Sequence, residues 1–286
     1  MALSGSFFIC LHKLKFNVIS KEKKLIADLS GKTAIITGGG QGLGLGISTK
    51  IAGQGANIIV TDLDDRNKST VEELAKTNNV DFLYLEMDVM NSEQITESMK
   101  KAIDFSKIDI LVNNAGVPGA PGSTGTRWRD EDWDFTWKVN VKGLHEVTEA
   151  ILPHMIENKS GKIINISSVA AKAAKYATAY YATTKMAVIA YTQALAREFG
   201  SSNINVNAIA PGRILTQFHK DWVENRKKLG DTTTDLFSKE SLSSVMPLGR
   251  AQSPEDIGAL AAFLASEDAK NITGQTIQCD GGQVMS

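Results

Sequence analysis

Two adjacent tyrosines, Tyr180 and Tyr181, precede Lys185 in the stretch YYATTKMAV. A tyrosine hydroxyl ordinarily titrates at about pH 10, which makes it a weak base at neutral pH. A lysine one helical turn after a tyrosine lies on the same helix face and brings a positive charge close to the phenol. Such a pair could take a proton from an alcohol while a hydride leaves the adjacent carbon.

The energy that this chemistry requires limits where the pair can lie. Lowering a tyrosine pKa from about 10 to about 7 requires about 4 kcal/mol of extra stabilisation of the phenolate. One ammonium at about 4 Å supplies that energy at an effective dielectric of about 20, but only about 1 kcal/mol in bulk water. We therefore expect Lys185 to act in a partly closed site, helped by a further positive charge.

Short apolar runs rich in β-formers begin at Thr33 and recur along the chain, each followed by a helical or polar segment. The runs are TAIIT, NIIVTD, DFLYLE, IDILVNN, GKIINIS, INVNAIA and a final GQTIQCDGG. Continuous apolar strands that alternate with helices are typical of parallel strands buried on both faces. We predict an α/β fold, a single-domain Rossmann-type doubly wound parallel sheet of about seven strands with helices on both faces. The domain is predicted to span 29–286, after a weakly ordered N-terminal extension, 1–28.

The composition narrows the function. The chain has 286 residues, 42% hydrophobic and 22% charged, and a net charge of −1, which offers no basic surface for nucleic acid. Two cysteines, Cys10 and Cys279, cannot build a disulfide framework, and the scattered histidines lack zinc-ligand spacing, so no metal is expected. No apolar run reaches the roughly 18 residues of a membrane helix. We expect a cytoplasmic protein without a secretory signal, although the basic N-terminus, with no acid before Glu22, leaves organelle targeting open.

A glycine-rich turn, TGGGQGLGLG, follows the first predicted strand. It matches Gly38-x-x-x-Gly42-x-Gly44, whereas GxGxxG fits in no register. Glycines allow a sharp turn from strand to helix and a close approach of the backbone to a pyrophosphate at the helix N-terminus. A tight turn without a ligand is the alternative.

Asp62 closes the second predicted strand. A carboxylate at this place can accept both hydroxyls of an adenosine ribose, and it would repel a 2′-phosphate. Gln41 in the glycine turn supplies no cation to offset that repulsion. Both features favour NAD over NADP. A helix cap or turn residue is the alternative, since Asp64 and Asp65 show that acids are common here.

Six short motifs recur in one order along the chain: TGGGQGLG (37–44), NNAG (113–116), NISS (165–168), YATTK (181–185), PGRILT (211–216) and CDGG (279–282). In these motifs the sequence resembles the short-chain dehydrogenase/reductase family, from Leu29 to Gly282. The family motif is Tyr-x-x-x-Lys, with a serine thirteen residues before the tyrosine. Both spacings select Tyr181, with Ser168 and Lys185, over Tyr180.

The resemblance implies a role for each catalytic residue. Tyr181 would be the general acid/base, and Lys185 would also bind the nicotinamide ribose. Ser168 would hydrogen-bond the substrate oxygen, with Ser167 the weaker candidate by spacing. Asn140 would hold a water in a proton relay, although an ordinary helix asparagine is the alternative.

The resemblance also implies a set of cofactor contacts in the glycine turn, after the second, third and fourth strands, and in the PGRILT motif. Beside Tyr181 and Lys185 they are Gly38, Gln41, Gly42, Leu43, Gly44, Asp62, Leu63, Asp88, Val89, Asn114, Ala115, Gly116, Pro211, Gly212, Ile214 and Thr216.

Two loops, 116–130 and about 215–246, leave strands at the carboxyl edge and are predicted to wall the site, the second as a substrate loop. Weaker indications fall mostly on these loops. Arg127, Trp128 and Arg129 could meet an anionic substrate or form an exposed basic loop. His219 and Trp222 could line the pocket. Packing or lining roles are expected for Tyr176, Tyr180, Trp133 and Trp137, the last two at a helix that pairs subunits in the family.

The motifs together predict an NAD-dependent oxidoreductase that transfers a hydride between nicotinamide and a secondary alcohol or ketone, such as a polyol or diol. The resemblance implies a homo-oligomer, a tetramer or a dimer. A 3-oxoacyl reductase that uses NADPH and a basic docking patch is the alternative within the family. A dinucleotide-binding protein without catalysis is the alternative outside it.

Overall fold

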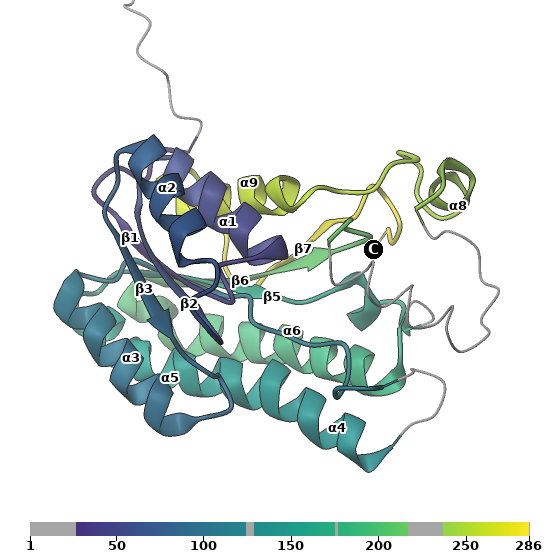
Figure 1. Cartoon of the computed structure of the whole chain (residues 1–286), viewed down its shortest axis with the longest axis horizontal. Helices are drawn as coiled ribbons and strands as arrows, with labels where there is room; N and C mark the ends of the chain where they lie inside the picture. Colours follow the sequence, from purple (N-terminus) through teal and green to yellow (C-terminus); the bar gives the residue numbers. More distant parts are fainter. Residues whose placement is uncertain (1–26, 124–128, 175–176, 217–236, 286) are drawn as a thin grey trace, which may run out of the picture.

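Seven parallel strands form one sheet in the order β3-β2-β1-β4-β5-β6-β7 (Figure 1), which confirms the predicted fold. The computed structural model describes residues 27–123, 129–174, 177–216 and 237–285. The strands are β1 (Thr33–Thr37), β2 (Asn57–Asp62), β3 (Phe82–Glu86), β4 (Ile110–Asn113), β5 (Gly161–Ile166), β6 (Ile204–Pro211) and β7 (Thr276–Cys279). Every residue of β1 and β6 is buried, as continuous apolar runs in a doubly covered sheet require.

Helices cover both faces of the sheet (Figure 1). One face carries α1 (Gly42–Gly53), α2 (Lys68–Asn78) and α9 (Pro254–Ala265). The other carries α3 (Ser92–Phe105), α4 (Asp130–Trp137), α5 (Leu144–Glu157) and α6 (Ala179–Phe199). Shorter elements are the π-helical turn η1 (Lys138–Gly143), the 3-10 turns η2 (Val169–Ala171), η4 (Gly200–Ser202) and η5 (Glu267–Ala269), and helix α8 (Lys239–Ser243). Each face of the sheet thus packs its own apolar cluster.

The strand order places a ligand crevice at one point of the sheet. Strand β1 pairs with β2 on one side and with β4 on the other, so the chain connections leave it in opposite directions. Ligands of open α/β sheets bind at such a switch point, outside the carboxyl ends of the strands. The glycine turn follows β1 and the NNAG motif closes β4, so both lie at this point.

Helices α1 and α9 approach closely, which fixes the direction of α1 behind the glycine turn. A Cβ atom on Gly46 would lie 2.3 Å from the Cβ of Pro254, and one on Gly258 would lie 2.5 Å from the carbonyl oxygen of Gly46. Helix α9 begins with a capping box, in which Ser253 and Asp256 each accept a backbone N–H of the other. This cap satisfies backbone donors at the helix start that would otherwise lack partners.

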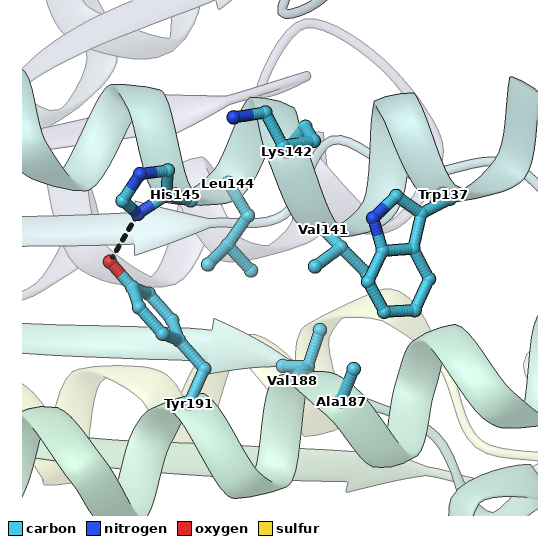
Figure 2. A pocket seen from close by; sticks show the side chains of 8 residues that line it. All are labelled: Trp137, Val141, Lys142, Leu144, His145, Ala187, Val188 and Tyr191. Atoms are coloured by element: carbon cyan, nitrogen blue, oxygen red, sulfur yellow. Dashed lines mark hydrogen bonds between the residues drawn. The ribbon is translucent and has the colours of Figure 1, made fainter. Parts of the chain in front are cut away.

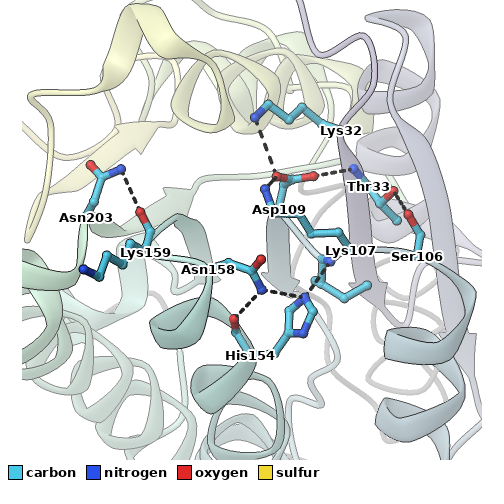
Figure 3. Close-up of polar contacts among 10 residues, drawn as sticks. Lys32, Thr33, Ser106, Lys107, Asp109, His154, Asn158, Lys159 and Asn203 are labelled. Atoms are coloured by element: carbon cyan, nitrogen blue, oxygen red, sulfur yellow. Dashed lines mark hydrogen bonds and ion pairs between the residues drawn. The ribbon is translucent and has the colours of Figure 1, made fainter.

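The amino ends of the strands form the opposite edge of the sheet, where Asp109 lies at the centre of a polar network (Figure 3). Its carboxylate accepts the backbone N–H of Thr33 at 3.2 Å and lies 2.9 Å from the Lys107 ammonium and 3.6 Å from that of Lys32. Nearby, the Nε2 of His154 accepts the backbone N–H of Ile108 at 3.1 Å. These contacts join β1 and β4 to α5.

The structure locates the predicted domain boundary and parts of the two predicted loops. Ala27 and Leu29 are buried in the apolar cluster under α1 and α9, so packed structure begins at or before the predicted boundary. The loop 116–130 is irregular as far as it is described, and α4 begins at Asp130. The loop 215–246 contains α8, and its residues 217–236 lie outside the described part.

Candidate active site

The glycine turn leaves backbone open at the N-terminus of α1, the place where a pyrophosphate would bind. Gly42 has a φ of +51°, and a Cβ there would meet nothing within 4 Å. Gly44 is the reverse, because a Cβ there would lie 1.9 Å from the carbonyl oxygen of Gly38. The exposed Gln41 precedes the helix, and Leu43 lies in its first turn. An open backbone at a helix N-terminus fits a dinucleotide.

The carboxylate of Asp62 faces the glycine turn. Its side chain is 8% exposed and accepts the backbone N–H of Gly40 at 3.1 Å and that of Leu63 at 2.9 Å. The Leu63 side chain is exposed. Burial, and then the negative charge of Asp62, raise the pKa of Tyr84 to about 12. The end of β2 is therefore a region of negative potential beside the turn.

Asn114 ties β4 to the glycine turn rather than pointing freely into the crevice. Its side-chain amide donates to the carbonyl oxygens of Thr37 at 2.9 Å and Gly38 at 3.0 Å. The Thr37 hydroxyl accepts the backbone N–H groups of Asn114 and Ala115 in return. This lock holds the two halves of the crevice in register.

Ser168 lies close enough to Tyr181 for its hydroxyl to lower the pKa of the phenol. The residues lie thirteen apart, and Tyr181 stands in the first turn of α6 while Ser168 caps η2 through the N–H of Ala170. Ser167, in contrast, is buried and donates to the backbone carbonyl of Lys185 at 2.8 Å. The Ser167 hydroxyl therefore anchors helix α6. Of the two serines, Ser168 is the one that interacts with the Tyr181 phenol.

Lys185 is 4% exposed and lies on the same helix face as Tyr181, with its ammonium 5.8 Å from the centre of the Tyr181 ring. The ammonium donates to the carbonyl oxygen of Ile166 at 2.9 Å. A Cβ on Gly116 would lie 3.2 Å from this ammonium and 3.2 Å from the Asn140 side-chain oxygen. Only a glycine backbone fits easily between these two side chains.

The pKa shifts of Tyr181 and Lys185 describe the pair before any cofactor binds. Burial raises the pKa of Tyr181, and the hydrogen bond from Ser168 opposes that shift. Burial also lowers the pKa of Lys185 to about 8, which weakens the positive charge that the phenolate needs. For both groups desolvation is the largest cause of the shift, and it disfavours the charged form. The positive charge of an oxidised nicotinamide would oppose the shift of the Tyr181 pKa.

Asn140 lies in the π-helical turn η1 and is 1% exposed. Its oxygen accepts the N–H of Val117 at 2.8 Å, and its amide donates to the Val117 carbonyl at 2.9 Å and to the Thr184 hydroxyl at 3.1 Å. These contacts connect the loop after β4 to α6. Thr184 was not predicted, because its only local signal is its place one residue before Lys185.

The remaining predicted contacts flank this centre. Asp88 and Val89 follow β3. Val89 packs closely against Gly143, because a Cβ on Gly143 would lie 2.6 Å from the carbonyl oxygen of Val89. At the end of β6, Pro211 is buried, Gly212 lies against Asp280 and Gln252, and Ile214 bridges to Gln252. Thr216 ends the described part of this loop, and its N–H donates to the Ile214 carbonyl.

Arg129 does not offer a free cation to an anionic substrate. Its guanidinium donates to both carboxylate oxygens of the buried Asp132, each at 3.1 Å. This pairing favours the alternative of an exposed basic loop at this residue. Arg127, Trp128, Tyr176, His219 and Trp222 lie outside the described residues.

A small groove lies between η1, α5 and α6 (Figure 2). The exposed Trp137 forms one wall, and the Tyr191 hydroxyl, 3.1 Å from the Nδ1 of His145, forms the other. None of the predicted catalytic or cofactor residues lines it. Among the described residues, no cluster of three acidic, histidine or cysteine side chains could hold a metal, and no helix has the length and apolarity to cross a membrane.

Comparison with known proteins identifies the family. The family model described as enoyl-(acyl carrier protein) reductase matches residues 38–283. The chain belongs to the short-chain dehydrogenase/reductase family. It is therefore an oxidoreductase of that family, as its motifs predicted.

Relatives in this family share about a third of the sequence. The 3-oxoacyl-(acyl-carrier-protein) reductase FabG of Thermotoga maritima is 35% identical over 260 residues, 90% of this chain and 99% of that protein. The oxidoreductase UcpA of Salmonella typhimurium is 36% identical over 259 residues, 90% of this chain and 96% of that protein. The L-sorbose reductase of Gluconobacter frateurii, solved with NADPH and L-sorbose, matches with a TM-score of 0.81 and 30% identity, over 91% of this chain and 99% of that one.

Proposed function

We propose that the protein transfers a hydride between nicotinamide and the carbinol carbon of a small secondary alcohol or the corresponding ketone, with NAD as the preferred cofactor. The observation that carries the reaction is the buried Lys185 ammonium 5.8 Å from the centre of the Tyr181 ring, with Ser168 close enough to lower the pKa of the phenol. A bound nicotinamide dinucleotide would supply the hydride acceptor or donor. Its ligands would be the predicted residues of the glycine turn and of the ends of β2, β3, β4 and β6.

The proton steps belong to this chain's own side chains. Ser168 donates a hydrogen bond to the substrate oxygen and stabilises the charge that develops on it. Tyr181 takes the alcohol proton in oxidation and returns it to the oxygen in reduction. Lys185, when protonated, favours the phenolate of Tyr181. Asn140 holds the loop after β4 beside Lys185 through Val117.

The preference for NAD rests on Asp62. A buried carboxylate that faces the turn would accept ribose hydroxyls and would repel a 2′-phosphate. Arg66, the nearby cation, is paired with Asp64. A specific observation favours NADPH as the second candidate, since the L-sorbose reductase of similar fold was solved with NADPH. In that case Arg66 would have to leave Asp64 for the phosphate.

A fluorescence titration of the purified chain with NADH and NADPH tests the proposal. We expect NADH to bind at least about tenfold more tightly, which corresponds to about 1.4 kcal/mol. Asp62→Ala should reduce this ratio of affinities. Asp65→Asn, a control at an exposed residue three positions after Asp62, should leave the ratio unchanged. A panel of polyols, diols, ketoses and a 3-oxoacyl thioester then tests turnover. Tighter binding of NADPH together with reduction of the thioester would replace this proposal with the 3-oxoacyl reductase alternative.

A further inference from the structure

Tyr180, the neighbour of Tyr181, is buried in an unusual way for a residue beside a reaction centre. Its side chain is 1% exposed, and its ring meets that of Trp133 edge-on, with centroids 6.1 Å apart. Its hydroxyl lies 2.9 Å from the Ser123 hydroxyl, in the loop after β4. A buried phenol is usually placed so that its hydroxyl finds a partner. Here that partner belongs to a wall of the predicted site.

Asp132, in the first turn of α4, lies beside the same loop. The Asp132 side chain is fully buried, and Arg129 holds the pKa of its carboxyl below the usual range. An ionised carboxylate only accepts hydrogen bonds, and Asp132 accepts from the guanidinium of Arg129.

The backbone of the loop lies against Asp132 and Tyr180. The N–H of Ala120 donates to Asp132 at 3.3 Å. Gly119 is buried, and a Cβ there would lie 3.0 Å from both the Tyr180 and the Ser123 hydroxyl oxygens. The start of the loop is held separately, because Asn140 binds both backbone groups of Val117. Loosening residues 119–123 would thus leave the surroundings of Lys185 in place.

We propose that Tyr180 is a positioning residue that sets the substrate-facing wall of the site by holding loop residues 119–123 against the start of α6 through the Ser123 hydroxyl. This inference rests on the proposed function, because it assumes that the loop faces the substrate. Tyr180 touches neither of the catalytic hydroxyl groups in this role. Its effect is on how tightly the substrate is held, and the chemical step remains with Ser168, Tyr181 and Lys185.

Steady-state kinetics of Tyr180→Phe and Ser123→Ala, with a substrate that the panel identifies, test this role. Each variant loses one hydrogen bond and keeps the surrounding packing, so we expect the substrate KM to rise about threefold to tenfold. The kcat and the NADH affinity should stay within about twofold. The double variant should raise the KM no further than either single variant, because both single changes remove the same hydrogen bond. Tyr191→Phe, which removes a hydroxyl from the same helix beside His145, should change none of these values.

Hydrogen exchange of the amides in 117–123 provides a readout that needs no substrate. In Tyr180→Phe these amides should exchange at least about threefold faster, while those of β3 keep the rate of the native protein. Unchanged exchange would overturn the proposal, as would a fall in kcat at unchanged KM or a lowered melting temperature with unchanged kinetics. If no substrate in the panel is turned over, the proposed function fails, and exchange still decides whether Tyr180 holds the loop.

Discussion

The two edges of the sheet treat buried charge in opposite ways. At the amino edge, the carboxylate of Asp109 is 5% exposed as a residue and lies between two ammonium groups and a backbone N–H. At the carboxyl edge, Lys185 is 4% exposed and donates to a neutral carbonyl oxygen, and its pKa falls to about 8. The carboxylate has cations as partners, whereas the ammonium is buried among neutral groups, and desolvation lowers its pKa.

This difference indicates that the amino edge contributes stability and the carboxyl edge contributes chemistry. The Asp109 network connects β1, β4 and α5 through hydrogen bonds and ion pairs. Lys185 and Tyr181 carry a desolvation cost in the ligand-free protein, and that cost makes their protons sensitive to an added charge. Perturbed groups in a cleft are where catalytic residues are expected. The comparison predicts that substitutions at the two edges have separable effects on activity and stability.

The largest effect is expected for Tyr181→Phe. The change removes the proton-carrying hydroxyl and keeps the ring beside Lys185, so turnover should fall about 10²- to 10⁴-fold. NADH binding should stay within about twofold, since the phenol is one of many predicted contacts. Initial rates and a cofactor titration measure both values. If the variant turned over substrate like the native protein, the carboxyl edge would not be the reaction centre, and the alternative of a non-catalytic binding protein would gain support.

Lys185→Met tests the cost of the buried ammonium through the pH dependence of the free energy of unfolding. The folded-state pKa of about 8 lies below the usual 10.5, so the cost of burying the ammonium is complete below pH 8. That cost fades as the pH rises from about 8 to about 10.5, where the unfolded chain also loses the proton. At 1.36 kcal/mol per unit, its full size is about 3 kcal/mol.

We therefore expect the free energy of unfolding of the native protein to gain about 2 kcal/mol on the Met variant between pH 7 and pH 10. Urea unfolding of both proteins at the two pH values measures this change, and the lost bond to Ile166 largely cancels in the comparison. A difference that stays constant with pH would mean that Lys185 is not electrostatically strained. Turnover should be low in the variant at both pH values.

Much of the scaffold could be predicted because its signals are local. Continuous apolar runs gave the strands, and the glycine turn lies directly after β1 as its spacing required. Tyr181 and Lys185 could be paired because residues four apart share a helix face. The i,i+3 spacing of Arg129 and Asp132 was equally local and could have warned that the arginine is engaged.

Other features depend on contacts between distant residues and could not be predicted. The link from Tyr180 to Ser123 spans 57 positions, and the link from Asn140 to Thr184 spans 44. The direction of the Tyr181 pKa shift is set by burial against the interaction with Ser168, and only the folded arrangement sets the burial. The sequence thus indicated which groups do chemistry, but not how far the protein alone prepares them.

The smallest effects belong to the amino edge. Asp109→Asn leaves an amide facing Lys107 and Lys32, and we expect a loss of about 1 to 2 kcal/mol in the free energy of unfolding. Lys107→Ala should cost under about 1 kcal/mol, because the lysine side chain is 47% exposed and solvent screens the pair. Neither variant should change turnover by more than about twofold, since Asp109 and Lys107 lie at the edge opposite the site. Urea unfolding and initial rates check both, and an activity loss larger than the stability loss would show that the two edges are coupled through β4.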